Sequence, residues 1–229
     1  MVRRRMTSGA TGRSLRALLT LLLFCAVDAP RALAQGTVVF NNLVSTAVIT
    51  HVYLPLPANP GCVQFGNGAG DYPPGTTDWT GRTPVSGSGF SAQLFAAPGA
   101  DVPVDSLTPA LPVTTFRTGS FAGFVNGVTA TLTGVPFVSP VATVQMRVWD
   151  NQGGTIPDWL TALAQPAGTE RVGLSAPINV NGPFIELPRL LTGLQSFNLT
   201  YIPEPSPLWL VALGGFSLWF ARLGKRRPA

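Results

Sequence analysis

The chain has 229 residues, of which 25 are Gly and 22 are Pro, and only 11% are charged. This composition argues against a charged, helix-rich cytosolic protein and is typical of a turn-rich β protein. The formal net charge of +5 comes from the two ends, because residues 35–202 contain five Arg against eight Asp or Glu. A domain without a basic surface has nothing to neutralise phosphates, so we expect no nucleic-acid partner.

The first 34 residues have the parts of a secretory signal peptide. A basic leader precedes the apolar run "ALLTLLLFCAV", whose 11 residues are too few to span a membrane as a helix. Ala32 and Ala34 then form an A-x-A site, which predicts cleavage between Ala34 and Gln35. We expect export through the Sec translocon and cleavage by signal peptidase. Cleavage removes Cys25 and leaves only Cys62, so an intrachain disulfide is not expected.

Residues 35–202 are predicted to form one all-β domain. Apolar and polar residues alternate with period two in several segments: "TVVFNN", "STAVITHVYL", "GFSAQLFAA", "VTTFRTG", "GVTATLTGV", "VATVQMRVWD" and "SFNLTYI". This alternation indicates antiparallel strands with one face toward the core and one toward water. About seven such strands, separated by turns rich in Gly, Pro and Asn, favour a single antiparallel β-sandwich of Ig-like or jelly-roll-like type.

One short helix and two long loops interrupt the predicted strands. The helix is predicted within "TIPDWLTALAQPAG", because Pro157 suits a first helical turn and Asp158 suits its positive end. Residues 55–88 and 98–112 are rich in turn formers and have little periodicity. Loops of this length often carry function.

Patterns for catalysis or metal binding are weak. The single histidine, His51, lies in a predicted strand on the same face as Tyr53, and no G-x-S-x-G elbow accompanies it. This pattern favours a packed or surface histidine over a triad member. One His and one Cys do not supply the three or four ligands of a zinc site. The carboxylates leave a glycosidase open, although Asp beside Gly or Pro is typical of turns. We therefore predict no enzyme, no metal site and no cofactor.

Three tryptophans, Trp79, Trp149 and Trp159, are the best candidates for ligand contact. An exposed Trp beside polar residues can stack on a sugar ring or anchor a protein partner. Trp149 lies on the polar side of its predicted strand, and Trp79 lies in the long loop 55–88. The alternative for all three is packing beneath a loop or a helix.

The last 27 residues combine three features in order. The tripeptide Pro203-Glu204-Pro205 precedes an apolar segment, 208–223, which rises about 24 Å as a helix against a hydrocarbon core of about 30 Å. With its flanking residues and some snorkelling, this segment can span a membrane. By the positive-inside rule, the domain then lies outside and the basic tail lies in the cytoplasm; the tail comprises Arg222, Lys225, Arg226 and Arg227.

The segment "IPEPSPLWLVALGGFSLWFARLGKRR" resembles the PEP-CTERM sorting signal of Gram-negative bacteria. The segments "GTVVFNN", "AQLFAAPG", "FRTG" and "VQMRVWD" are more loosely similar to β-rich surface proteins that carry this signal. The resemblance implies processing near the PEP tripeptide by an exosortase, a membrane cysteine protease/transpeptidase. It also implies an association with bacteria that produce exopolysaccharide and form biofilms.

Three segments are therefore expected: a signal peptide (1–34), an extracellular β-domain (35–202) and a sorting signal (203–229). The expected function is that of an exported, exosortase-processed protein of the cell surface or extracellular matrix, with a structural or adhesive role. One alternative is a carbohydrate-binding module that uses exposed Trp and loop 55–88. A weaker alternative is a secreted hydrolase.

Overall fold

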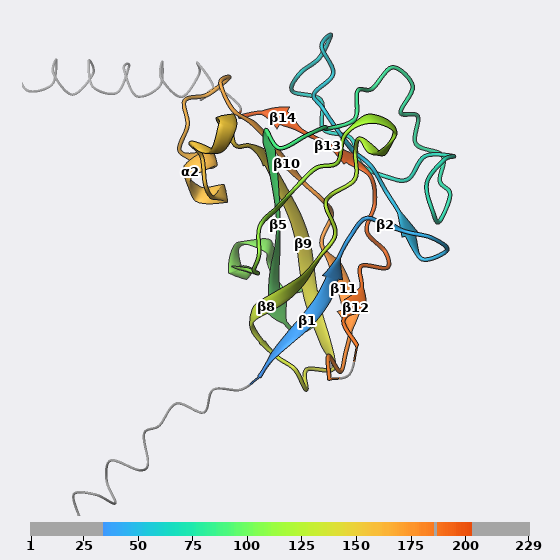
Figure 1. The fold of residues 1–229 in the computed structure, drawn as a ribbon, viewed down its shortest axis with the longest axis vertical. Helices are drawn as coiled ribbons and strands as arrows, with labels where there is room; N and C mark the ends of the chain where they lie inside the picture. Colours follow the sequence, from blue (N-terminus) through green and yellow to red (C-terminus); the bar gives the residue numbers. More distant parts are fainter. Residues whose placement is uncertain (1–33, 186, 203–229) are drawn as a thin grey trace, which may run out of the picture. The chain divides into compact units, whose positions relative to one another are not determined.

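The computed structural model describes residues 34–185 and 187–202. Over these residues the chain consists mostly of β-strands in sheets, with a single short α-helix (Figure 1). No helix among them is long and apolar enough to cross a membrane. The predicted signal helix and the predicted transmembrane helix of 203–229 lie outside the described residues.

The elements follow in chain order, with the longest strands in the middle of the chain. They are β1 (Gln35–Phe40), β2 (Leu43–Val44), β3 (Val48–Ile49), β4 (Val52–Tyr53), β5 (Phe90–Pro98), η1 (Val104–Ser106), β6 (Thr108–Pro109), β7 (Thr114–Thr115), η2 (Gly119–Phe121), β8 (Val128–Pro136), β9 (Val141–Asp150), η3 (Gln152–Gly154), α2 (Trp159–Leu163), β10 (Arg171–Leu174), β11 (Ile178–Asn181), β12 (Arg189–Leu190), β13 (Phe197–Asn198) and β14 (Thr200–Tyr201).

The two largest sheets are built around two long antiparallel pairs. Strands β5 and β9 pair over their whole length and lie at the centre of a seven-stranded sheet, in the order β14-β10-β9-β5-β6, with β11 also on β9 and β7 also on β5. Strand β1 pairs with β8 in a second sheet and also with β12. The β1–β12 and β4–β13 pairs are parallel, so the expectation of purely antiparallel pairing is wrong for these two short contacts.

The main hydrophobic core draws on both of these sheets. Strand β8 alternates as predicted, with Ala130 and Leu132 buried and Thr129 exposed. Its inward residues belong to the same cluster as Phe40 of β1 and Met146 of β9. Burial of each large apolar side chain of this kind contributes roughly 1.5–3 kcal/mol, so the core is the main source of stability.

Strands β5 and β9 are buried on both faces, which corrects the prediction of one wet face. The second face is covered by a smaller cluster in which Trp159 of α2 packs with Trp149 and Phe95. The glutamines on this face pair with backbone carbonyls, Gln93 with that of Ala110 and Gln145 with that of Ser175. Such pairing makes polar side chains compatible with burial.

Helix α2, which provides this cover, confirms a short helix in this segment, but it begins at Trp159, so Pro157 precedes the helix and is not in its first turn. Asp158 is its N-cap, and the Asp158 carboxylate accepts from the backbone N–H of Thr161 at 2.8 Å. This cap satisfies one of the N–H groups that a helix start leaves free.

Two of the predicted strands are each split into short pieces. The segment 45–54 forms β3 and β4 with His51 between them, and the segment 196–202 forms β13 and β14 with Leu199 between them. The two segments lie side by side and are hydrogen-bonded: the Phe197 N–H donates to the His51 carbonyl, and the Leu199 N–H donates to the Tyr53 carbonyl. Loop 55–88 gathers at the same end of the domain as β2 and β13 (Figure 1).

Candidate functional site

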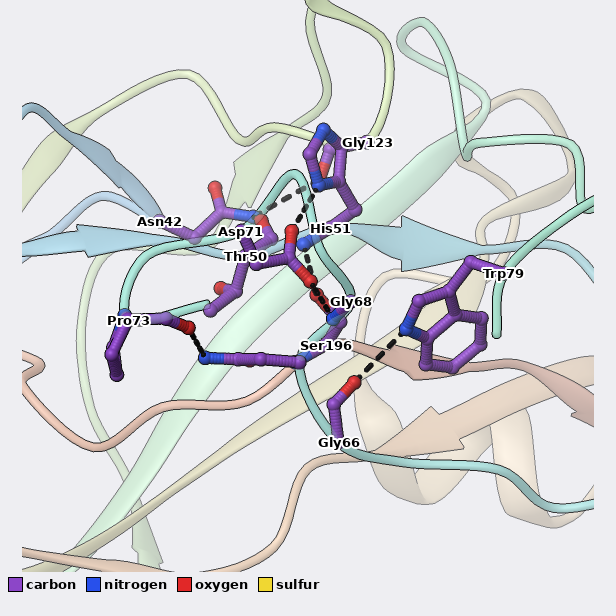
Figure 2. Close-up of polar contacts among 11 residues, drawn as sticks. Asn42, Thr50, His51, Gly66, Gly68, Asp71, Pro73, Trp79, Gly123 and Ser196 are labelled. Atoms are coloured by element: carbon purple, nitrogen blue, oxygen red, sulfur yellow. Dashed lines mark hydrogen bonds and ion pairs between the residues drawn. The ribbon is translucent and has the colours of Figure 1, made fainter. Parts of the chain in front are cut away.

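A buried carboxylate, Asp71, joins three distant parts of the chain. Its Oδ1 lies 2.7 Å from His51 Nδ1, and its Oδ2 accepts from Ser196 Oγ at 2.8 Å and from the Gly68 N–H at 2.7 Å (Figure 2). The Asp71 side chain is only 3% exposed, whereas that of His51 is 23% exposed. Both carboxylate oxygens are therefore engaged, and the histidine is the member of this cluster that reaches solvent.

The Asp71 carboxylate is held in its charged form. Burial acts to raise the pKa of Asp71, but its hydrogen bonds to His51, Gly68 and Ser196, together with electrostatic attraction to His51, lower the pKa below the ordinary value of 3.8. A charged carboxylate accepts from Nδ1–H of the imidazole, which orients the ring and leaves Nε2 as an acceptor in the neutral histidine.

Further hydrogen bonds fix the loop that carries Asp71. The Gly66 N–H donates to the Ser196 carbonyl at 2.8 Å, and Asn67 Nδ2 donates to the Pro73 carbonyl at 2.7 Å. The Ser196 N–H in turn donates to Asn67 Oδ1 at 3.2 Å. The buried Asn42 side chain donates to the carbonyl of Thr50, the residue before His51, at 2.6 Å (Figure 2). The cluster is thus built on a hydrogen-bonded frame and not on a free loop.

An open pocket of about 360 Å³ lies beside this cluster. Its walls are His51 and Tyr53 together with the loop segments 68–71 and 77–80. This volume is at the low end of the range of roughly 300–1,000 Å³ for small-molecule sites. Aromatic walls with a few convergent polar groups are typical of such sites.

The rings of His51, Tyr53 and Trp79 line the pocket and contact one another, and the ring of Phe124 packs against His51. The ring of His51 lies 4.3 Å from that of Phe124 and 5.8 Å from that of Tyr53, measured between centroids. The Tyr53 ring is stacked on that of Trp79 at 4.5 Å. His51 and Tyr53 are two residues apart in an extended segment, so their side chains share a face, as predicted.

Trp79, one of the three candidate tryptophans, lines this pocket, whereas Trp159 is buried in the smaller hydrophobic cluster. The Trp79 ring is half-buried, and its Nε1 donates to the Gly66 carbonyl at 2.9 Å (Figure 2). Tyr53 covers one ring face, and the Arg82 guanidinium carbon lies 5.9 Å from the ring centroid. Trp79 is therefore a fixed wall of the pocket and not an isolated, freely accessible ring.

The structure contradicts the prediction that Trp149 contacts a ligand. Trp149 is fully buried in the cluster beneath α2, and its Nε1 donates to the Ile156 carbonyl at 3.0 Å. The alternation that assigned it to a polar face was correct, but that face is covered by α2 and its flanking segment. A buried indole with a satisfied N–H packs the core and has no surface left for a ligand.

The cluster around Asp71 differs from a Ser–His–Asp triad in its connections. In a triad, the serine Oγ bonds to the histidine ring nitrogen that receives its proton. Here Ser196 Oγ donates to Asp71, and it also accepts from the backbone N–H of His51 at 2.7 Å. Ser196 is fully buried, so it is a bridging residue and not an exposed nucleophile.

Two carboxylates outside the pocket, Asp150 and Glu170, lie near β10 and η3. Asp150 forms an ion pair with Arg171, while Glu170 is fully buried and accepts from Gln152 Nε2 at 2.9 Å. Burial is the main cause that raises the pKa of Glu170 above its ordinary value of 4.5. Glu170 has no exposed surface for a substrate, so this pair does not form the accessible acid and base of a glycosidase.

The other candidate residues are spread over the chain. Within residues 34–185 and 187–202, no group of three or more His, Cys, Asp or Glu is suited to hold a metal ion. Cys62 is a free, partly exposed thiol. Gln35 is the first residue of β1. The remaining predicted signal and sorting residues, apart from Ala34, lie outside the described part of the chain; they are Ala32, Pro203, Glu204, Pro205, Arg222, Lys225, Arg226 and Arg227.

Sequence reasoning missed Asp71 and Ser196 as members of the site. Asp71 lies 20 positions from His51 and Ser196 lies 125 positions from Asp71. The only local signal was a glycine-rich loop that ends in Asp71, and such a loop predicts a turn equally well.

Comparisons with known proteins found no matching family model, no matching curated protein and no matching solved structure.

Proposed function

We propose that the chain is an exported protein that acts at the cell surface or in the extracellular matrix, in a structural or adhesive role. The observation that carries this proposal is the fit between the β-domain and the two terminal signals. Strand β1 begins at Gln35, the first residue after the predicted cleavage site, and β14 ends at Tyr201, two residues before Pro203. Removal of both signals therefore leaves every described strand intact.

In this proposal the two ends serve export and sorting. The Sec translocon exports the chain, signal peptidase removes 1–34, and the apolar segment of 203–229 holds the protein transiently in the inner membrane. An exosortase then cuts near Pro203–Pro205. Two prolines favour an extended backbone, which a protease can bind at a low ordering cost, and Glu204 adds a charged contact.

We also propose that the β-domain is a β-sandwich of Ig-like or jelly-roll-like type. Its support is the shared core, in which Val38 of β1 and Leu132 of β8 cluster with Leu94 of β5 and Val144 of β9. Two sheets whose inward side chains form one core are the basis of that architecture.

The intact mass of the protein from its native host tests the sorting proposal. In cells with an active exosortase, we expect a mass that begins at Gln35 and ends near Pro203–Pro205, with or without an added group. The matched control is the same host without its exosortase, in which residues 203–229 should remain. Membrane-bound protein that keeps 203–229 in exosortase-active cells would contradict the proposal.

A second candidate function, carbohydrate binding, is favoured by the pocket at Trp79. The pocket combines an aromatic wall with polar side chains of His51, Thr77 and Thr80, which suits a sugar unit. A polysaccharide matrix would supply such a ligand to an adhesive surface protein.

A polysaccharide-binding assay with Trp79→Ala tests this second candidate. We expect binding by the unmodified protein and its loss in Trp79→Ala. Phe121→Ala is the matched control, because Phe121 is a half-exposed aromatic residue that does not line the pocket. Equal loss in both variants, or no binding to any polysaccharide tested, would count against carbohydrate binding without affecting the sorting proposal.

A further inference from the structure

We infer that the pocket beside Trp79 selects an uncharged polysaccharide, and that His51 Nε2 is the acceptor for one of its hydroxyl groups. This inference rests on the proposed carbohydrate binding and adds to it the ligand class and the residue that recognises it. It follows from the orientation of the His51 ring, from the hydroxyl groups around it and from the charges that line the pocket.

The first step is the free nitrogen of His51. Its Nδ1 is committed to Asp71, whereas Nε2 has no hydrogen-bond partner among residues 34–185 and 187–202 and is not shut off from solvent. Because Asp71 accepts the Nδ1 proton, the neutral ring presents a lone pair at Nε2. A hydroxyl group of a sugar is a suitable donor to that lone pair.

The second step is the rigidity of this acceptor. The Phe124 ring lies against the imidazole at a centroid distance of 4.3 Å. Gly123 lies so close to the ring that a Cβ at this position would be 3.0 Å from His51 Cδ2. Packing on these sides and the Asp71 hydrogen bond hold the ring in one orientation. A fixed acceptor binds its ligand with little loss of side-chain entropy.

The third step is the presence of hydroxyl-bearing residues in the lining of the same pocket. Burial, with a contribution from the Asp71 carboxylate, raises the pKa of Tyr53 to about 12, so its hydroxyl remains protonated at neutral pH. Thr77 and Thr80 add two more hydroxyl side chains to the pocket lining. Sugar hydroxyls both donate and accept, so a pocket that offers both functions matches them.

The fourth step is the charge of the pocket. The ionisable residues that line it are His51, Tyr53, Asp71 and Asp78, and none of these is a lysine or arginine. Arg82 lies near Trp79, but its Nη2 donates to Gln64 and its Nη1 is shut off from solvent. A uronate, sulfate or phosphate group would therefore meet the exposed carboxylate of Asp78, and no lysine or arginine lines the pocket to offset it. Like charge without a compensating partner disfavours an anionic polymer.

The test compares two histidine substitutions in the full chain, purified in mild detergent, with dextran as the neutral probe and alginate as the polyuronate probe. His51→Asn keeps a side-chain N–H near the position of Nδ1 for Asp71 but has no atom at Nε2. His51→Gln places its amide near Nε2 and loses the Nδ1 position. Tyr53→Phe removes the hydroxyl donor and keeps the stacked ring. Thermal unfolding of each variant shows whether the domain is still folded.

We expect the unmodified protein to bind dextran and not alginate. His51→Asn should weaken dextran binding about tenfold, which is the change in affinity expected for the loss of one hydrogen bond. This variant should retain most of the thermal stability. His51→Gln should bind more tightly than His51→Asn although it is the less stable of the two. Tyr53→Phe should weaken binding by a similar factor and serves as the independent readout if His51→Asn does not fold.

Three results would overturn this inference. Alginate binding equal to dextran binding would contradict the ligand class. Dextran binding unchanged in both His51→Asn and Tyr53→Phe would contradict the recognition roles, while leaving the Trp79 test of carbohydrate binding intact. Loss of dextran binding in Trp79→Ala, with binding retained in His51→Asn and Tyr53→Phe, would show that the pocket binds sugar by ring contacts and not through His51.

Discussion

The imidazole of His51 and the carboxylate of Asp71, 20 positions apart in the chain, are joined by a hydrogen bond of 2.7 Å between Nδ1 and Oδ1. Asp71 also accepts from Ser196, which precedes β13. These bonds fasten loop 66–71 to the segments that carry β3, β4 and β13, and they form one side of the pocket. A single carboxylate thus both holds these segments together and fixes one wall of the pocket.

Asp71→Asn should destabilise the domain substantially. The substituted amide keeps the size of the side chain but has one acceptor oxygen in place of two. At least one of the groups that donate to Asp71, on His51, Gly68 or Ser196, therefore loses its acceptor. A hydrogen bond to a charged group contributes about 1.5–3 kcal/mol, and we expect a loss of free energy of unfolding of that order. Urea unfolding followed by tryptophan fluorescence provides the measurement. Asp78→Asn, at an exposed position of the same pocket, is the control and should unfold like the original protein.

The pH dependence of stability should show two carboxyl groups acting in opposite directions. The pKa of Asp71 is lowered in the folded state, so its contribution is present above about pH 3.8 and is lost as the pH falls through the folded-state pKa. The pKa of Glu170 is raised, so its ionisation opposes folding, and this penalty grows as the pH rises from about 4.5 through the folded-state pKa.

Glu170→Gln isolates the second of these effects. The amide cannot ionise, and its oxygen can still accept from Gln152. We therefore expect the variant to gain stability relative to the original protein between pH 4 and pH 7. Urea unfolding at these two pH values measures the difference. An identical pH dependence in the two proteins would mean that Glu170 does not oppose folding when ionised.

Trp149→Ala should reduce stability and leave ligand specificity unchanged. Removal of a fully buried indole creates a cavity between β9 and α2, which costs about 3–5 kcal/mol. Thermal unfolding should show a large drop in midpoint, while dextran binding at a temperature where the variant is folded should equal that of the original. Loss of binding in a folded Trp149→Ala protein would restore the prediction that this residue contacts the ligand.

Gly75→Ala should disturb the loop that forms the pocket. A Cβ at Gly75 would collide with the backbone carbonyl of Asn67, and backbone cannot move aside as a flexible side chain can. We expect a loss of about 1–3 kcal/mol, as for other overpacked sites. Gly70→Ala is the matched control, since a Cβ there meets nothing within 4 Å. Similar unfolding midpoints for the two variants would show that the loop is looser than its hydrogen bonds indicate.

The main β-strands and the start of α2 follow from local sequence patterns. Strands β5, β8 and β9 and the Asp158 cap were predictable, because a period-two pattern and an N-cap depend on residues close together in the chain. The acidic balance of 35–202, with the basic residues confined to the two ends, is likewise a property of the sequence alone.

By contrast, long-range packing determines which side chains meet and which face of a strand is covered. Alternation assigned Trp149 to the polar face of β9, but α2 covers that face, and nothing in the local pattern carries this information. His51, Asp71 and Ser196 come together from segments 20 to 145 residues apart. Hydrogen bonds over such separations depend on the path of the whole chain, so the site emerges only once the sheets have brought loop 55–88 onto β4 and β13.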